Sequence, residues 1–83
     1  MNPYKNLAVS ADVLARKIRA ARNAVQNATP MQRQSIVNML TRDIANGVAQ
    51  VDRQARNLGL QVDRRLNIEN HYRTLANIAR SHS

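Results

Sequence analysis

Apolar side chains recur along the first part of the chain at alternating spacings of three and four residues. They are Tyr4, Leu7, Ala11, Leu14, Ile18, Ala21, Val25 and Ala28. This heptad pattern predicts an amphipathic helix that packs along a neighbouring helix. Asn2 and Pro3 form a typical helix start, since Asn caps free backbone N–H groups and proline lacks the first of them. We therefore expect a helix over residues 3–27.

A second helix is predicted over residues 30–58. Thr29, Pro30 and Gln32 have the spacing of a cap, a first-turn proline and a capping-box partner. Only two or three residues then remain for the loop, so the two helices form an antiparallel hairpin. The apolar residues that share one face of this helix are Val37, Leu40, Ile44, Val48, Val51, Ala55 and Leu58. Gly47 interrupts the run and indicates close approach of another backbone, for instance where the alanine stripe of the first helix crosses.

The chain offers two continuations at Gly59. In a continuous helix, the repeated QVDR segments (50–53 and 61–64) would place Arg42, Arg53 and Arg64 on one face, about 16 Å apart. Alternatively, Gly59 adopts the left-handed conformation that ends many helices, and Leu60 folds back against the apolar face. We favour the stop, because Leu60 would otherwise lie on the polar face of a continuous helix.

A shorter third helix is then expected over about 63–80, with Asp63 or Asn67 as its cap. The fold class is all-α: one domain over residues 1–83, built as an antiparallel hairpin of two long helices plus a shorter C-terminal helix. Because 83 residues give only a thin core, we expect a homo-oligomeric bundle, for example a homodimer. The predicted oligomer interface is Met31, Ile36 and Met39, which lie off the main apolar stripe.

Charge is the strongest compositional signal. Thirteen Lys and Arg residues against five Asp and Glu give a formal charge of +8, and most of the cations are Arg. Small domains with this balance typically bind phosphate groups or acidic protein surfaces, and the planar guanidinium suits bidentate recognition of both. With two Tyr and neither Phe nor Trp, stacking of single-stranded bases is disfavoured. Duplex nucleic acid is the preferred partner.

Two sets of residues are candidates for nucleic-acid binding. Ala55, Gly59 and Leu60 have the spacing of a helix-turn-helix unit. The second helix of that unit would present Arg64, Arg65 and Asn67 to base edges and Arg73 to phosphate. The second set needs no motif and consists of cations on helix faces: Arg42, Arg53, Arg56, Arg16 and Arg19. The alternative for the first set is a plain helix that ends at a glycine. The alternative for the second set is a solvated surface, partly neutralised by the neighbouring Asp12, Asp43, Asp52 and Asp63.

Enzymatic chemistry is not indicated. The chain has no cysteine, and Glu69 and His71 are two residues apart, so on a helix they point in different directions. We expect no catalytic residues, no metal and no cofactor. No segment resembles a signal peptide or a membrane span, so we expect a cytoplasmic protein without a membrane partner. The alternative function is a protein-interaction module, such as an adaptor, an inhibitor or an assembly subunit, that binds an acidic protein.

Overall fold

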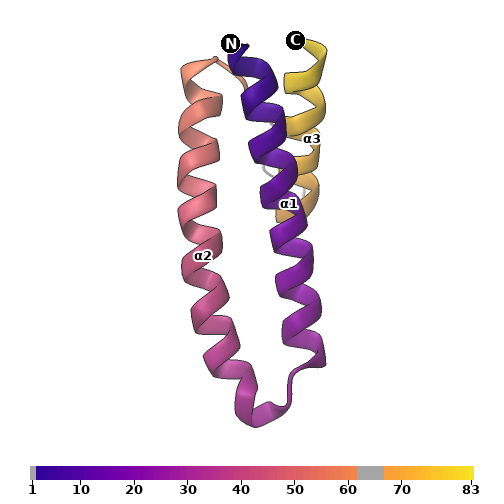
Figure 1. Cartoon of the computed structure of the whole chain (residues 1–83), viewed down its shortest axis with the longest axis vertical. Helices are drawn as coiled ribbons and strands as arrows, with labels where there is room; N and C mark the ends of the chain where they lie inside the picture. The colour runs from indigo at the N-terminus through magenta and orange to yellow at the C-terminus, as the bar shows by residue number, and fades with distance from the viewer. Residues whose placement is uncertain (1, 62–66) are drawn as a thin grey trace.

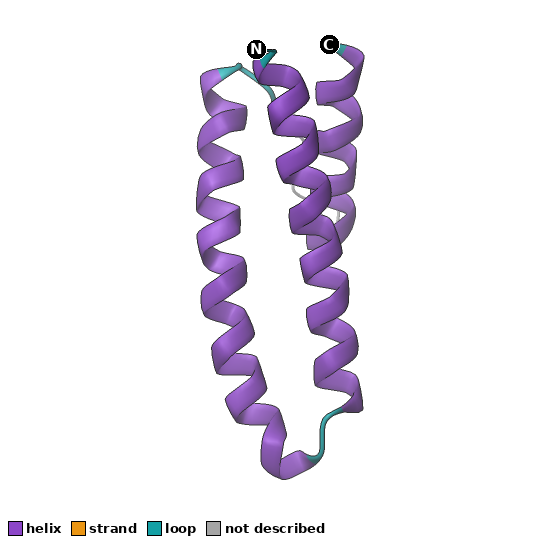
Figure 2. Cartoon of the chain, in the orientation of Figure 1, coloured by secondary structure: helices purple, strands orange, loops and turns teal. Residues whose placement is uncertain are grey.

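The computed structural model describes residues 2–61 and 67–83, which form three helices: α1 (Pro3–Asn27), α2 (Pro30–Asn57) and α3 (Ile68–Ser81). Figure 1 shows α1 and α2 as a long antiparallel hairpin, with α3 beside the N-terminal part of α1. The molecule measures 45 × 20 × 18 Å. Figure 2 shows only helices, loops and turns in the described ranges. The predicted all-α class and helical hairpin are confirmed.

The N-terminal caps of the hairpin helices differ from each other. Asn2 caps α1 as expected, since its Oδ1 accepts hydrogen bonds from the backbone N–H groups of Tyr4 at 3.0 Å and Lys5 at 3.4 Å. Before α2, the Thr29 side chain makes no cap hydrogen bond, although Pro30 occupies the first turn. The Thr29 carbonyl instead accepts from the N–H groups of Gln32 and Arg33. The hairpin therefore forms with its predicted short loop, but without the Thr29 side-chain bond of a capping box.

α2 ends by the predicted glycine stop. Gly59 has φ +71°, in the left-handed region. Its N–H group donates to the Arg56 carbonyl at 3.1 Å, and the N–H group of Leu60 donates to the Ala55 carbonyl at 3.0 Å. These two bonds form a Schellman motif, which satisfies carbonyls at the helix end. Leu60 packs against the core, as the stop requires.

α3 begins at Ile68 and ends at Ser81. Residues 63–66 of the expected helix lie outside the described residues. Of the two expected caps, Asn67 fills the role: its backbone is extended, and its Oδ1 accepts from the Asn70 N–H group at 2.9 Å.

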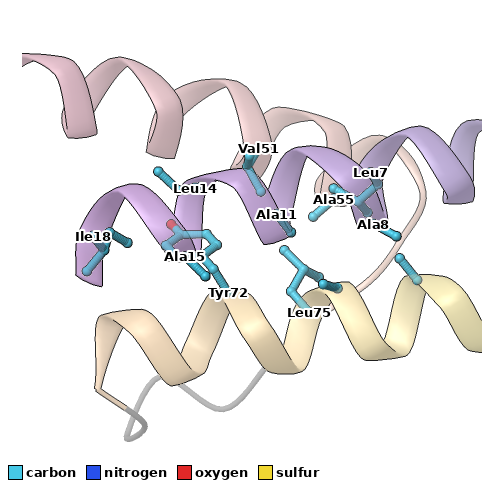
Figure 3. Close-up of a cluster of buried hydrophobic side chains, with 12 residues drawn as sticks. Leu7, Ala8, Ala11, Leu14, Ala15, Ile18, Val51, Ala55, Tyr72 and Leu75 are labelled. Atoms are coloured by element: carbon cyan, nitrogen blue, oxygen red, sulfur yellow. The ribbon is translucent and has the colours of Figure 1, made fainter. Parts of the chain in front are cut away.

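The core lies between the three helices (Figure 3). Among the described residues its members come from the end of the hairpin beside α3. The core consists of Leu7, Ala8, Ala11, Leu14, Ala15, Ile18, Val51, Ala55, Tyr72, Leu75, Ala76 and Ala79. The many alanines bring the α1 and α3 backbones close together. A hydrogen bond of 2.9 Å from the Tyr72 hydroxyl to Asp52 Oδ1 joins α3 to α2.

Gly47 lies where α1 approaches α2. A Cβ atom added at Gly47 would be only 2.9 Å from Cδ1 of Leu14, and Leu14 is itself buried. The glycine therefore makes room for a leucine side chain of the neighbouring helix. The expected close approach of a backbone is therefore wrong in its partner, because the end of the Leu14 side chain is what approaches Gly47.

The loop end of the hairpin is much less covered. None of residues 30–50, all of which the structure describes, is buried. Val25, Ile36, Val37 and Leu40 are only half-buried and lie outside the core cluster. α3 packs beside the other end of the hairpin, so this half consists of two helices as far as residues 2–61 and 67–83 show.

Candidate nucleic-acid interface

Each carboxylate that the structure describes has a partner within the chain. Asp12 pairs with Arg80, and Asp43 lies 3.9 Å from the Lys17 ammonium. Asp52 accepts the bond from Tyr72. The remaining one is Glu69, which is 7% exposed and receives Arg22 on Oε1 at 2.7 Å and Arg73 on Oε2 at 3.0 Å. Asp63 lies outside the described residues.

These pairings leave most of the cations without a carboxylate. Among residues 2–61 and 67–83, the Lys and Arg residues without an ion pair are Lys5, Arg16, Arg19, Arg33, Arg42, Arg53 and Arg56. The sequence suggests neutralisation of the candidate nucleic-acid-binding cations by neighbouring Asp residues. Of those candidates, only Arg73 forms an ion pair in the described ranges. The acidic groups hold the helices together and leave the outer cations to solvent.

Three of the unpaired cations lie on one face of α2. Arg42, Arg53 and Arg56 are exposed, and at about 100° per residue they point away from the buried Val51 and Ala55. With a rise of about 1.5 Å per residue, the three side chains start within a strip about 21 Å long. We call Arg42, Arg53 and Arg56 the α2 basic strip. The helix backbone fixes where each of the three side chains begins.

A second group of cations lies between α1 and α3. Arg16, Arg73 and Arg80 line a surface hollow of about 370 Å³, together with Asp12, Ala15 and Asn77. Two of these guanidinium groups are already engaged: Arg73 with Glu69, and Arg80 with Asp12 and with Asn77 Oδ1 at 2.6 Å. Arg16 alone brings an unpaired charge to the hollow. Arg19 is exposed about one turn further along α1.

The predicted recognition helix finds no support in the described residues. Arg64 and Arg65 lie outside them, and Asn67 serves as the cap of α3. α3 starts eleven residues after Asn57, the last residue of α2, whereas a helix-turn-helix unit has a turn of about three or four residues. Arg73 lies beside α1, where it is bound to Glu69. Of the four residues, the structure describes only Asn67 and Arg73, and the side chains of both are engaged within the fold.

The predicted oligomer residues are accessible to different degrees. Met31 is 93% exposed and Met39 is 66% exposed, whereas Ile36 is half-buried. All three lie on α2, in the half of the hairpin that α3 does not cover. Self-association through them stays a prediction.

The sequence indicates only one of the two ion pairs of Glu69. The spacing of four residues between Glu69 and Arg73 is typical of a helical ion pair. Arg22 is 47 residues away from Glu69 in the chain, so no local pattern indicates that contact. The same is true of Tyr72 and Asp52.

The described residues contain no cluster of three or more His, Cys, Asp or Glu side chains arranged to hold a metal ion. No described helix combines the length and hydropathy that a membrane span requires. Comparison of the chain with protein-family models, with curated protein sequences and with solved structures gave no match.

Proposed function

We propose that this protein binds duplex nucleic acid by its phosphate backbone, with the α2 basic strip as the main contact. The observation that supports this function is the distribution of partners. The described side-chain carboxylates have partners within the chain, while Arg42, Arg53 and Arg56 are exposed and form no ion pair in the described ranges. A guanidinium group without an intramolecular partner is available for bidentate bonds to phosphate.

Such binding would be sequence-nonspecific, because the duplex backbone carries the same charge at every step, about one per 1.7 Å of axis. A rigid strip of arginines reads charge and shape, whereas base recognition needs side chains in a groove. An architectural factor fits this behaviour, and so does a regulator that uses other residues for specificity. Arg16 and Arg19 on α1 would add phosphate contacts at a second surface.

The test is a fluorescence anisotropy titration of a labelled 20-base-pair duplex at several salt concentrations. We expect the logarithm of the binding constant to fall linearly with the logarithm of salt, by about 0.9 per phosphate contacted. Replacing the whole α2 basic strip with Gln should reduce the magnitude of that slope by about 2 to 3. A variant that removes equal charge elsewhere, Lys5→Gln with Lys17→Gln and Arg33→Gln, should retain most of the slope.

Two outcomes would contradict the proposal. Absence of binding at low salt would remove nucleic acid as the partner, despite the formal charge of +8. Equal loss in the two triple variants would show that net charge alone, and no particular surface, governs the interaction.

Self-association is a second proposal, supported by the exposure of Met31 and Met39 beside Ile36. Large apolar side chains that stay exposed on one helix are candidates for an interface. Sedimentation velocity over a range of concentrations should show a dimer that Met31→Ser with Met39→Ser dissociates. A monomer at all concentrations would contradict it.

A further inference from the structure

Near the loop that joins α1 and α2, the hairpin has an apolar face. It lies on the side of the hairpin that α3 covers at the other end. Spacings of three and four residues place its members in two stripes, one on each helix. They are Ile18, Arg22 and Val25 on α1, and Arg33, Val37, Leu40 and Ile44 on α2. We call this set the hairpin face.

The hairpin face is covered at one end only. Ile18 is buried, and Ile44 packs against the core. Val25, Val37 and Leu40 are half-buried and lie nearer the loop. α3 has 14 residues, or about 21 Å of helix, in a molecule 45 Å long. The described ranges therefore leave about 24 Å of the hairpin without a third helix, enough for about 16 helical residues.

The charges around this face are almost all positive. Arg22 and Arg33 belong to the stripes, and Arg19 lies one turn from Arg22 on the side toward α3. Arg19 and Arg33 have no ion pair among the described residues. Glu69, which binds Arg22, already holds Arg73 as well.

This charge distribution selects among possible occupants. A second hairpin face would bring another Arg19 and Arg33 against the first pair and would supply no unpaired carboxylate from the described residues. A helix with acidic flanks would instead place carboxylates beside both arginines. We propose that the hairpin face binds an acidic amphipathic helix of a partner protein, in line with α3, so that a three-helix bundle continues to the loop.

In this mode the apolar residues of the partner, at spacings of three and four, would cover Val25, Val37 and Leu40. Its flanking Asp or Glu side chains would pair with Arg19 and Arg33. The α2 basic strip points to the opposite side of α2, so this activity goes beyond nucleic-acid binding by the strip and is separable from it. Arg19 is shared with the second phosphate surface, whereas Leu40 belongs to the hairpin face alone.

A pair of synthetic peptides tests the proposal. Each is an 18-residue fluorescein-labelled helix with Leu at the heptad a and d positions, and the e and g positions carry Glu in one peptide and Lys in the other. We expect the intact protein to bind the Glu peptide at least tenfold more tightly than the Lys peptide. Leu40→Ser should weaken binding of the Glu peptide at least tenfold, and Arg19→Gln with Arg33→Gln should weaken it severalfold.

Matched control variants distinguish a loss of contacts at the hairpin face from a loss of exposed apolar side chains elsewhere. Val9 and Val13 on α1 are 57% and 45% exposed and lie outside the core and outside the hairpin face, so Val9→Ser and Val13→Ser should leave peptide binding unchanged. Arg19 and Arg33 are exposed, so we expect their replacement to leave the fold intact. This variant therefore still tests the proposal if Leu40→Ser unfolds the protein. Circular dichroism checks helix content in every variant.

Three results would overturn the proposal: equal binding of the two peptides, no binding of either, or equal weakening by the control valine variants. A dimer that Leu40→Ser dissociates and Met39→Ser does not would identify a second copy as the occupant and would also overturn it. Duplex binding is also measured for Leu40→Ser, so that the two proposals can be distinguished. If this variant loses affinity for the peptide and keeps its affinity for the duplex, the substitution affects the hairpin face alone.

Discussion

Tyr72 and Asp52 form a direct polar link between α3 and α2. The phenol hydroxyl donates to Asp52 Oδ1 at 2.9 Å, while the Tyr72 ring is buried against α1. α3 otherwise packs mainly on α1. One side chain thus contributes both to the apolar core and to the attachment of the third helix to the hairpin.

Removing this hydroxyl should destabilise the fold without disturbing the packing of the ring. We expect Tyr72→Phe to lower the free energy of unfolding by about 1 to 2 kcal/mol, since a bond to a charged acceptor contributes more than one to a neutral group. Urea denaturation followed by circular dichroism measures the change. Tyr4→Phe is the control, because the Tyr4 ring stacks on His82 at the chain ends, and it should cost less than about 0.5 kcal/mol. Equal effects of the two variants would contradict the role given to the bond with Asp52.

Substitution of Glu69 should lower the free energy of unfolding more than substitution of either of its arginine partners. Its carboxylate is nearly buried and receives Arg22 from α1 and Arg73 from α3, whereas both arginines are about half exposed. We expect Glu69→Gln to cost about 1 to 2 kcal/mol, below the range for fully buried pairs because solvent screens the arginines. Arg22→Gln or Arg73→Gln alone should cost less than 1 kcal/mol, since the other arginine still binds the carboxylate. Thermal unfolding of the three variants in one buffer ranks their losses of stability. A larger loss of stability for either arginine variant than for Glu69→Gln would contradict this account.

Because Gly47 and Leu14 are in contact, the effects of substituting them on the free energy of unfolding should not be additive. Alanine at Gly47 gains about 1 kcal/mol of helix propensity, but its Cβ meets the buried end of Leu14, and overpacking costs about 1 to 3 kcal/mol. We expect Gly47→Ala to be destabilising by up to about 2 kcal/mol in wild-type background and stabilising in a Leu14→Ala background, where the space is free. A double-mutant cycle by urea denaturation measures this coupling. Additive effects would show that the two residues do not meet.

Local signals in the sequence predicted the parts of the fold that depend on neighbouring residues. The cap at Asn2 and the stop at Gly59 each rest on interactions within about five residues, so their residue types are informative. The ion pairs are different, because Arg22 and Glu69 meet only after α3 has packed on α1. Which cations stay unpaired therefore depends on tertiary structure. The sequence predicts Arg42, Arg53 and Arg56 as an outward-facing set, and all three are exposed. It gives no indication that Glu69 would also bind Arg22 of α1.

The stop at Gly59 sets the direction in which the chain leaves α2, and this gives the last prediction. A φ of +71° is unfavourable for residues with a Cβ atom, and nothing lies within 4 Å of a Cβ atom placed there. Gly59→Ala should therefore cost about 1 to 2 kcal/mol through backbone strain alone. Gly59→Asn should cost less, because asparagine tolerates the left-handed region better than alanine does. Thermal unfolding of the two variants separates this cause from steric conflict: a larger loss for the bulkier asparagine would point to a clash, whereas a larger loss for alanine identifies the left-handed backbone as the feature that ends α2.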